Sequence, residues 1–279
     1  MIKLIVIDLD GTLLNSDKSI SRENEEAIME ALERGVHVSI STGRSYVSGH
    51  KYVEQLGISV PVSYQNGALV VDGYDGAMRI ISQCLLGTAE ATAIYNRGRE
   101  RGFNCLVFFD FFNLPDISTT GLSDSPYRGY YAHNAYRIVF EEDPSKRIRE
   151  PGIAEIAIEG EEERIIEMIG TMRPGFDRVT VVKNDALERH AFYEFFGPGV
   201  GKSNGLKHIL EHLEIDWKEV AYIGDNYNDL DILKKCPLPV VMANAPDQVK
   251  KHAKIVTGKT NDESGVAEAI DRILNWRRD

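Results

Sequence analysis

The most constraining feature of this 279-residue sequence is an apolar run near its start that ends in two carboxylates. Residues 3–7 read Lys-Leu-Ile-Val-Ile, and Asp8, Leu9, Asp10 and Gly11 follow directly. A run that is apolar on both faces is typical of a buried strand in a parallel sheet. Because side chains two positions apart leave a strand on the same side, Asp8 and Asp10 are predicted to converge where this strand ends.

Two converging carboxylates at this place favour a binding site. In an open α/β sheet, ligands bind in the crevice at the carboxyl ends of the strands. Like charges held together are tolerated when a cation lies between them or when one keeps a proton, and oxygen ligands suit a hard ion such as Mg2+. A solvated turn is the alternative on this motif alone, because Asp and Gly are common turn residues.

Length and composition describe an ordinary globular protein with one large or two modest domains. No apolar run approaches the roughly 18 residues of a membrane span, and the N-terminal run ends in carboxylates instead of a cleavage site, so we expect a cytoplasmic protein. The net charge of −11 disfavours nucleic acid as a partner. Three cysteines without a C-x-x-C pair argue against disulfides or a zinc site. No pattern in the sequence sets an oligomeric state.

Strand, polar turn and helix follow one another in both end regions of the chain. A second strand over residues 36–40 stops at Ser41-Thr42-Gly43-Arg44, and another over 220–223 stops at Gly224-Asp225-Asn226-Tyr227-Asn228-Asp229. Helical periodicity lies between such strands, so right-handed crossovers and a parallel sheet are expected. The predicted fold class is therefore α/β, with a doubly wound, Rossmann-like parallel-sheet core.

Local signals predict where some elements of this core begin and turn. Ser21 can cap a first helix, and Ser203 can cap a later one that carries leucines and isoleucine at helical spacing. Asn66-Gly67 stands between two short apolar runs, which predicts a tight hairpin.

The middle of the chain has a different texture. From about Ile81, short strands and helices lose the regular alternation, and a Ser/Gly/Pro/Tyr-rich loop is expected over residues 118–131. We therefore expect an inserted α+β domain over residues 84–187, with residues 1–83 and 188–279 forming the core. Its candidate substrate contacts are Tyr127, Tyr130, Tyr131, His133 and Tyr136, although for any one of them packing against the sheet of this domain is the favoured interpretation.

Polar groups gather at four points of the predicted core. They are Asp8 with Asp10, Thr42, Lys202, and Asp225 with Asn228 and Asp229. Taken singly, each could be a turn, a cap or a solvated surface residue. Together they supply a nucleophile, a second carboxylate, oxygen ligands for a metal, a hydroxyl anchor and a cation, which is what phosphoryl transfer requires.

In these stretches the sequence resembles the haloacid dehalogenase (HAD) superfamily, and specifically its Cof-type phosphatases with a large C2 (IIB) cap. The matching stretches, in chain order, are Asp8–Leu14, Ser41–Arg44, Lys202 and Gly224–Asp229 for the four motifs, with further agreement at Asn66–Ala68, Ala243–Ala245 and Glu263–Val266. The resemblance spans the whole core, whereas the inserted domain matches only in size and coarse pattern.

The resemblance implies a Mg2+-dependent phosphatase that hydrolyses a small phosphorylated metabolite, such as a sugar phosphate, through an aspartyl-phosphate. Asp8 resembles the nucleophile and Asp10 the general acid and base. The implied metal ligands are Asp8, the backbone carbonyl of Asp10, Asp225, and Asp229 directly or through water. The implied phosphate contacts are Leu9, Thr42, Gly43, Lys202 and Asn228. The inserted cap would provide substrate specificity, because the core provides only the chemistry.

Three other functions are compatible with parts of this pattern. A phosphomutase shares the nucleophile but returns the phosphoryl group to its substrate. A receiver-type signalling domain also has an acceptor Asp, but such domains are about half this length and lack an insert. A catalytically dead phosphate-binding module is disfavoured by the presence of Asp8, Asp10 and Lys202 together.

Overall fold

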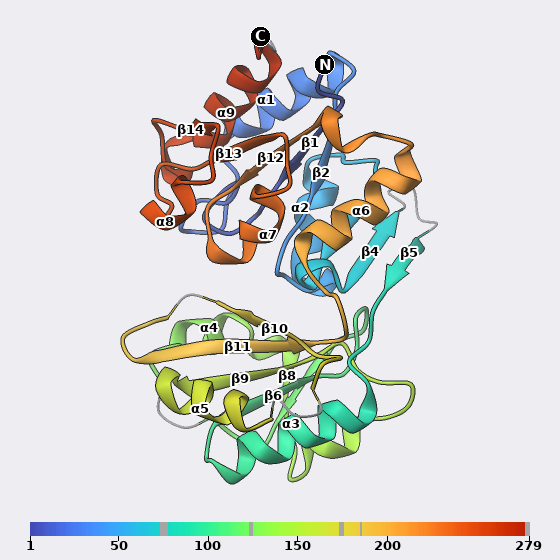
Figure 1. Ribbon diagram of the computed structural model, residues 1–279, viewed down its shortest axis with the longest axis vertical. Helices are drawn as coiled ribbons and strands as arrows, with labels where there is room; N and C mark the ends of the chain where they lie inside the picture. Colours follow the sequence, from blue (N-terminus) through green and yellow to red (C-terminus); the bar gives the residue numbers. More distant parts are fainter. Residues whose placement is uncertain (73–77, 123–124, 173–175, 185, 277–279) are drawn as a thin grey trace. The chain divides into compact units, whose positions relative to one another are not determined.

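The structure is a computed structural model that describes residues 1–72, 78–122, 125–172, 176–184 and 186–276. The chain divides into two units, one made of residues 1–83 and 201–279 and the other of residues 84–200. The two units share no sheet (Figure 1), and each has its own cluster of buried side chains.

The first unit is built on a five-stranded sheet whose strands all run parallel. Its strands, in spatial order, are β14 (Ile255–Val256), β13 (Leu238–Val241), β12 (Val220–Gly224), β1 (Leu4–Ile7) and β2 (His37–Ile40). All four residues of β1 are buried, as expected for a strand that is apolar on both faces.

Helices cover both faces of this sheet. On one face α1 (Arg22–Glu33) packs against α9 (Gly265–Leu274), and α6 (Lys202–Leu213) and α7 (Leu230–Leu233) pack over Leu4 and Tyr222 on the other (Figure 1). The remaining helices of this unit are α2 (Tyr46–Gln55) and α8 (Asp247–Lys250). This arrangement confirms the doubly wound α/β core. None of the helices in the described ranges combines the length and apolar character needed to cross a bilayer.

The register of β1 brings three loops to one edge of the sheet. Ile7 lies opposite Ile40 of β2 on one side and Ile223 of β12 on the other. β1 and β2 end at this level and β12 ends one residue later, at Gly224, so the loops that follow them, with Asp8 in the first, begin at the same edge. The strand order reverses here, because β2 lies on one side of β1 and β12 on the other. Ligands bind at such a point in open α/β sheets.

The two predicted helix caps have different outcomes. Ser21 caps α1, because its side chain accepts a hydrogen bond from the Asn24 amide at 3.3 Å. Ser203 does not cap α6, which begins at Lys202 after Gly201. The Ser203 amide instead donates to Oδ2 of Asp231 at 2.9 Å, so a carboxylate from another helix occupies the capping place.

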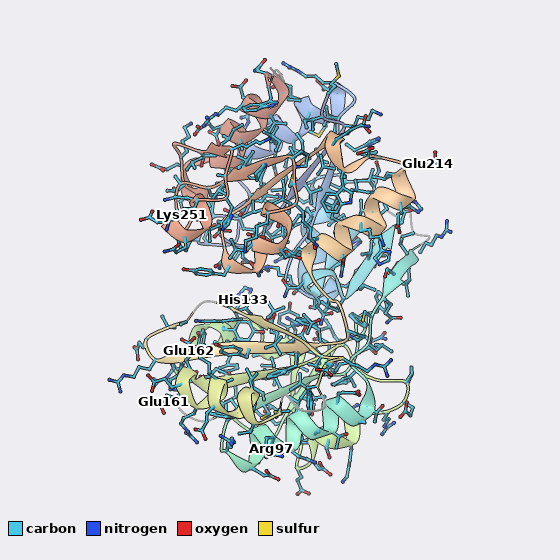
Figure 2. The ribbon with its side chains drawn as sticks, viewed as in Figure 1. Arg97, His133, Glu161, Glu162, Glu214 and Lys251 are labelled. Carbon is cyan, nitrogen blue, oxygen red and sulfur yellow. The ribbon has the colours of Figure 1, made fainter. Side chains whose placement is uncertain are left out.

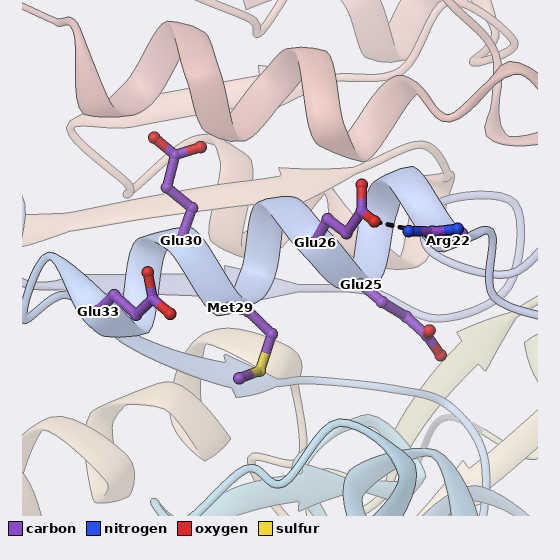
Figure 3. Close-up of a pocket in the computed structure, with 6 residues that line it drawn as sticks. All are labelled: Arg22, Glu25, Glu26, Met29, Glu30 and Glu33. Atoms are coloured by element: carbon purple, nitrogen blue, oxygen red, sulfur yellow. Dashed lines mark hydrogen bonds and ion pairs between the residues drawn. The ribbon is translucent and has the colours of Figure 1, made fainter.

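The outward side of α1 is a charged helix face. Figure 3 shows Arg22 next to Glu26, with which it pairs at 2.7 Å, and further acidic side chains along the same helix. Acidic residues in its first turn face the positive end of the helix dipole. The shallow pocket drawn in Figure 3 is lined by side chains of α1 alone. It is therefore a solvated surface and not a candidate site.

The Asn66-Gly67 stretch forms a hairpin, but not through a two-residue turn. Strands β3 (Val62–Tyr64) and β4 (Leu69–Asp72) pair antiparallel around a short 3₁₀ turn, η1 (Gln65–Gly67). β5 (Arg79–Gln83) completes this small sheet. The backbone φ angles of Gln65, Asn66 and Gly67 are 45°, 52° and 95°, so the turn is left-handed throughout.

The second unit is a six-stranded sheet with helices, as expected for an α+β domain. Its strands, in spatial order, are β10 (Thr180–Lys183), β11 (His190–Phe196), β9 (Glu155–Glu161), β6 (Asn104–Phe108), β7 (Ile117–Thr119) and β8 (Ile138–Phe140). Helices α3 (Thr88–Glu100) and α5 (Glu162–Met172) bury one face of the sheet. Helix α4 (Arg128–His133) packs by Tyr130 and Tyr131 against Phe192, on the opposite face.

The structure corrects two expectations about this unit. The core was expected to resume at residue 188, but β11 pairs antiparallel with both β9 and β10, so the second boundary lies between residues 200 and 201. The loop expected over residues 118–131 contains part of β7 and the start of α4. The pairing of β11 with β9 spans the whole of α5 and β10, a contact that local composition cannot indicate.

Candidate active site

The site of the first unit centres on a buried ammonium between two carboxylates. Nζ of Lys202 donates to Oδ1 of Asp8 at 2.7 Å and to Oδ1 of Asp229 at 2.6 Å. The lysine is fully buried and both carboxylates nearly so. Asp8 follows β1, Asp229 follows β12, and Lys202 opens α6, so three loops that are distant in sequence meet at this one group.

Asp225 completes a group of three buried carboxylates. One oxygen from each of Asp8, Asp225 and Asp229 lies within 4.8 Å of the others. Oδ1 of Asp225 accepts a hydrogen bond from the Thr12 hydroxyl at 2.7 Å. Gly11 makes this approach possible, because a Cβ at that position, where φ is +75°, would lie 2.3 Å from Oδ2 of Asp225.

Both oxygens of Asp229 are already engaged. Oδ1 accepts from Lys202 and from the Tyr222 hydroxyl, while Oδ2 accepts from the backbone amides of Asp225 and Asn226, both at 2.9 Å. A carboxylate with four donors is held rigidly. The geometry therefore gives Asp229 the role of holding Lys202 and the loop, and leaves Asp8 and Asp225 better suited to direct contact with an ion.

The charges of this cluster are not balanced within the protein. Burial raises the pKa of Asp8 to about 7, although Lys202 opposes the rise and the charge of Asp229 adds to it. Burial and the charge of Asp8 also raise the pKa of Asp225 well above its usual range. Burial alone would lower the pKa of Lys202, but the charges of Asp229 and Asp8 raise it.

This environment fits a divalent cation. Among the described residues, Lys202 is the one cationic side chain that forms ion pairs within this group, and its partners are Asp8 and Asp229. Buried negative charge of this kind is stabilised by a positive ion, and a donor set made only of oxygens suits Mg2+. Asp8 and Asp225 are the residues that would hold it, and they are two of the four metal ligands expected from the sequence.

Asp10 lies outside this cluster and has its own cations. Arg44 binds its carboxylate through two nitrogens, at 2.6 and 2.7 Å, and Nζ of Lys18 donates to it at 2.8 Å. Burial would raise the pKa of Asp10, but the hydrogen bonds and charges of these two residues lower it to about 2. Lys18 reaches Asp10 from a backbone with φ of 68°, a conformation that non-glycine residues rarely adopt.

The predicted phosphate contacts lie around the same edge. Thr42 is buried and follows β2, and its hydroxyl accepts from the Arg44 amide at 3.1 Å. Gly43 lies beside Asn66 and Asn228, since a Cβ on it would be 3.3 Å from Oδ1 of Asn66 and 3.7 Å from Nδ2 of Asn228. The side chain of Leu9 is fully buried, so only its backbone could contact a ligand.

Comparison with known proteins identifies the family of this chain. The family model of haloacid dehalogenase-like hydrolases matches residues 5–270. The chain belongs to this family. It is a hydrolase of the phosphatase type, and the resemblance found in its motifs is confirmed.

Several relatives match over nearly their whole length. The protein named 5-amino-6-(5-phospho-D-ribitylamino)uracil phosphatase YcsE of Bacillus subtilis is 30% identical, over 96% of this chain and 94% of its own. Phosphatase YwpJ of the same organism is 30% identical, over 98% of this chain and 100% of its own. A solved haloacid dehalogenase-like hydrolase from Bacteroides thetaiotaomicron is 29% identical, with a TM-score of 0.81 over 98% of this chain and 100% of that one.

Sequence reasoning assigned no role to several residues that shape this HAD site. They are Thr12, Lys18, Arg44, Asn66 and Tyr222. Thr12, Arg44 and Asn66 stand in stretches that matched the family motifs, which was an available signal. Lys18 and Tyr222 carried none, because each acts through a contact that only the folded chain creates.

Asp229 and Asp225 have different hydrogen-bond partners. Neutralising each of them is therefore expected to have opposite effects on the free energy of unfolding when metal is removed. In Asp229→Asn the amide group must face either Lys202 and Tyr222 or the two backbone amides, so one pair of donors loses its acceptor. We expect a loss of about 1–3 kcal/mol in the free energy of unfolding. Asp225→Asn removes a repelling charge beside Asp8 and should leave the stability equal or higher.

The measurement is urea unfolding of the wild type and both variants in EDTA. Comparison in EDTA separates this effect from any stabilisation by a bound ion. A larger loss of stability for Asp225→Asn than for Asp229→Asn would contradict this account of the two carboxylates.

Proposed function

We propose that this chain is a Mg2+-dependent phosphatase that hydrolyses a small phosphorylated metabolite through an aspartyl-phosphate on Asp8. The observation that carries the proposal is the buried Asp8 carboxylate, held at 2.7 Å by Lys202 beside Asp225. Bound Mg2+ would offset the repulsion between an anionic nucleophile and an anionic phosphate. Family membership supports the same reaction class.

In the first half of the reaction, an oxygen of Asp8 forms a bond to phosphorus while the bond to the ester oxygen breaks. Lys202 orients the Asp8 carboxylate and places a compact positive charge beside the transferring oxygens. The hydroxyl of Thr42 and the amide of Gly43 stand at the adjacent strand end, where they can contact the phosphate.

Asp10 is proposed to move the protons. It would protonate the departing ester oxygen and then take a proton from the water that attacks the phosphorus of the aspartyl-phosphate. The contacts of Arg44 and Lys18 hold Asp10 in its ionised form, which is the form required for the second half. The first half therefore requires these contacts to loosen so that Asp10 can carry a proton.

The substrate class is proposed from the relatives. Three relatives from Bacillus subtilis are named 5-amino-6-(5-phospho-D-ribitylamino)uracil phosphatases, and we include that ester with sugar phosphates among the substrates to assay. Release of inorganic phosphate from such esters distinguishes hydrolysis from the phosphomutase alternative. The three free cysteines suit the cytoplasm, where such metabolites occur.

Replacing the nucleophile should abolish turnover without unfolding the protein. Asp8→Asn has nearly the same shape but cannot form the aspartyl-phosphate, so we expect phosphate release to fall roughly a thousandfold or more. The matched control is Asp17→Asn, which neutralises an exposed residue of the loop that follows β1 and should retain activity. Near wild-type phosphate release by Asp8→Asn would refute covalent catalysis by this residue.

Removal of the metal should have an equally clear effect. Chelation by EDTA is expected to abolish phosphate release, and added Mg2+ should restore it. Asp225→Asn should shift the Mg2+ activation curve to higher concentration, because it removes one of the two carboxylates available to the ion. Full activity of the wild type after exhaustive chelation would show that the carboxylate cluster serves another purpose.

We further propose that the second unit, residues 84–200, selects the leaving group. Its aromatic candidates fall into two sets. Tyr127 and Tyr131 are committed to internal bonds, with His190 and with Glu159, and the ring of Tyr130 packs against Phe192. His133, at the end of α4, and Tyr136, which follows it, are both exposed (His133 is labelled in Figure 2). These two are therefore better placed to contact a substrate.

If this selection occurs, the double variant His133→Ala/Tyr136→Ala should change the ranking of phosphate esters by kcat/KM. It should spare p-nitrophenyl phosphate, which offers little for a specificity surface to recognise. The matched control is Arg97→Ala on α3, at an exposed residue on the opposite face of the same sheet (Figure 2). Equal losses on all esters would argue against a role in selection.

A further inference from the structure

The turn η1, Gln65–Gly67, is an unusual conformation placed beside the active site. Three successive residues have positive φ, and two of them are not glycine. Left-handed backbone is disfavoured for residues with a Cβ, and such strain persists where the surrounding structure imposes it, often at functional sites. All three residues are buried, so the conformation is not that of a free surface turn.

Backbone hydrogen bonds tie this turn to the loop after β2. The Asn66 amide donates to the carbonyl of Thr42 at 3.0 Å, and the Gln65 amide donates to the carbonyl of Arg44 at 2.9 Å. These bonds enclose Gly43, whose amide is a proposed phosphate contact. The left-handed turn therefore fixes the backbone that presents this amide.

The same turn lies directly against the start of α6. A Cβ on Gly67 would be 2.4 Å from the carbonyl oxygen of Gly201 and 3.1 Å from the amide of Gly205. Gly201 immediately precedes Lys202. Only a glycine allows this approach, so the position of η1 also sets the position of the lysine's helix.

The side chain of Asn66 extends these contacts to the third loop. Its Oδ1 accepts a hydrogen bond from Nδ2 of Asn228 at 3.3 Å. The same oxygen would lie 3.3 Å from a Cβ on Gly43. Asn66 is 1% exposed, so its amide group is enclosed between the two loops that carry predicted phosphate contacts.

We propose that Asn66 is a positioning residue of the phosphate site, which acts by holding Gly43 and Asn228 in the arrangement that binds a phosphate group. This inference rests on the proposed phosphate role of those two residues. It explains why a strained left-handed asparagine stands where a glycine would cost less, since glycine lacks the side chain that contacts Asn228.

The test measures binding of inorganic phosphate to the full-length chain in Mg2+ by titration calorimetry, together with thermal unfolding. Asn66→Gly suits the left-handed backbone and removes only the side-chain contacts, so the fold should persist while the phosphate Kd rises roughly tenfold or more. The matched control is Glu214→Gly, which relieves a φ of 55° at an exposed position after α6 (Figure 2) and should leave the Kd unchanged.

A second variant serves if Asn66→Gly does not fold. Asn66→Asp tolerates the same backbone and keeps an acceptor for Asn228, but places a negative charge near the anion, so phosphate binding should weaken as well. Wild-type phosphate affinity in a folded Asn66 variant, or no phosphate binding by the wild type, would overturn the inference. Phosphate binding without ester hydrolysis would instead leave it standing and reject the proposed function.

Discussion

The active site depends on the two hydrogen-bonded ion pairs that the ammonium of Lys202 forms. This ammonium bridges two carboxylates that lie 194 and 27 residues away in the sequence. Removing one partner of a buried charge pair leaves the other uncompensated, which costs far more than the pair contributes. Lys202 therefore holds together loops that would otherwise bring three buried negative charges into contact. Its ammonium, which forms these ion pairs, is also the group proposed to bind phosphate.

Much of this arrangement could be predicted from local features of the sequence. The apolar run before Asp8 identified a buried central strand, and polar turns after the strands ending near Ile40 and Ile223 identified the edge where the site lies. These features are local because burial on both faces demands an unbroken apolar run. The register of the three strands then brings their ends, and the polar turns that follow them, to the same edge of the sheet.

What could not be predicted depends on contacts between distant parts of the chain. The pairing of Asp10 with Arg44 and Lys18 lowers the pKa of its carboxyl, yet no spacing in the sequence indicates that either cation reaches Asp10. β11 carries aromatic residues that favour a strand, but only its hydrogen bonds to β9 place it in the inserted unit. The positive φ of Gln65 is likewise not indicated by the sequence, because the Asn-Gly pair alone favours a two-residue turn.

The position of the inserted unit has a consequence for how the protein is made. β1 pairs with β12 on one side, and β12 leaves the ribosome only after the whole of residues 84–200. Until then the N-terminal segment has a central strand with one edge unpaired, a state prone to association with other chains. The insert is a continuous stretch that can fold first, because domains form as units during synthesis. The first unit, whose chain is interrupted by the insert, is thus completed last. The edge of β1 that pairs with β12 stays unpaired until then.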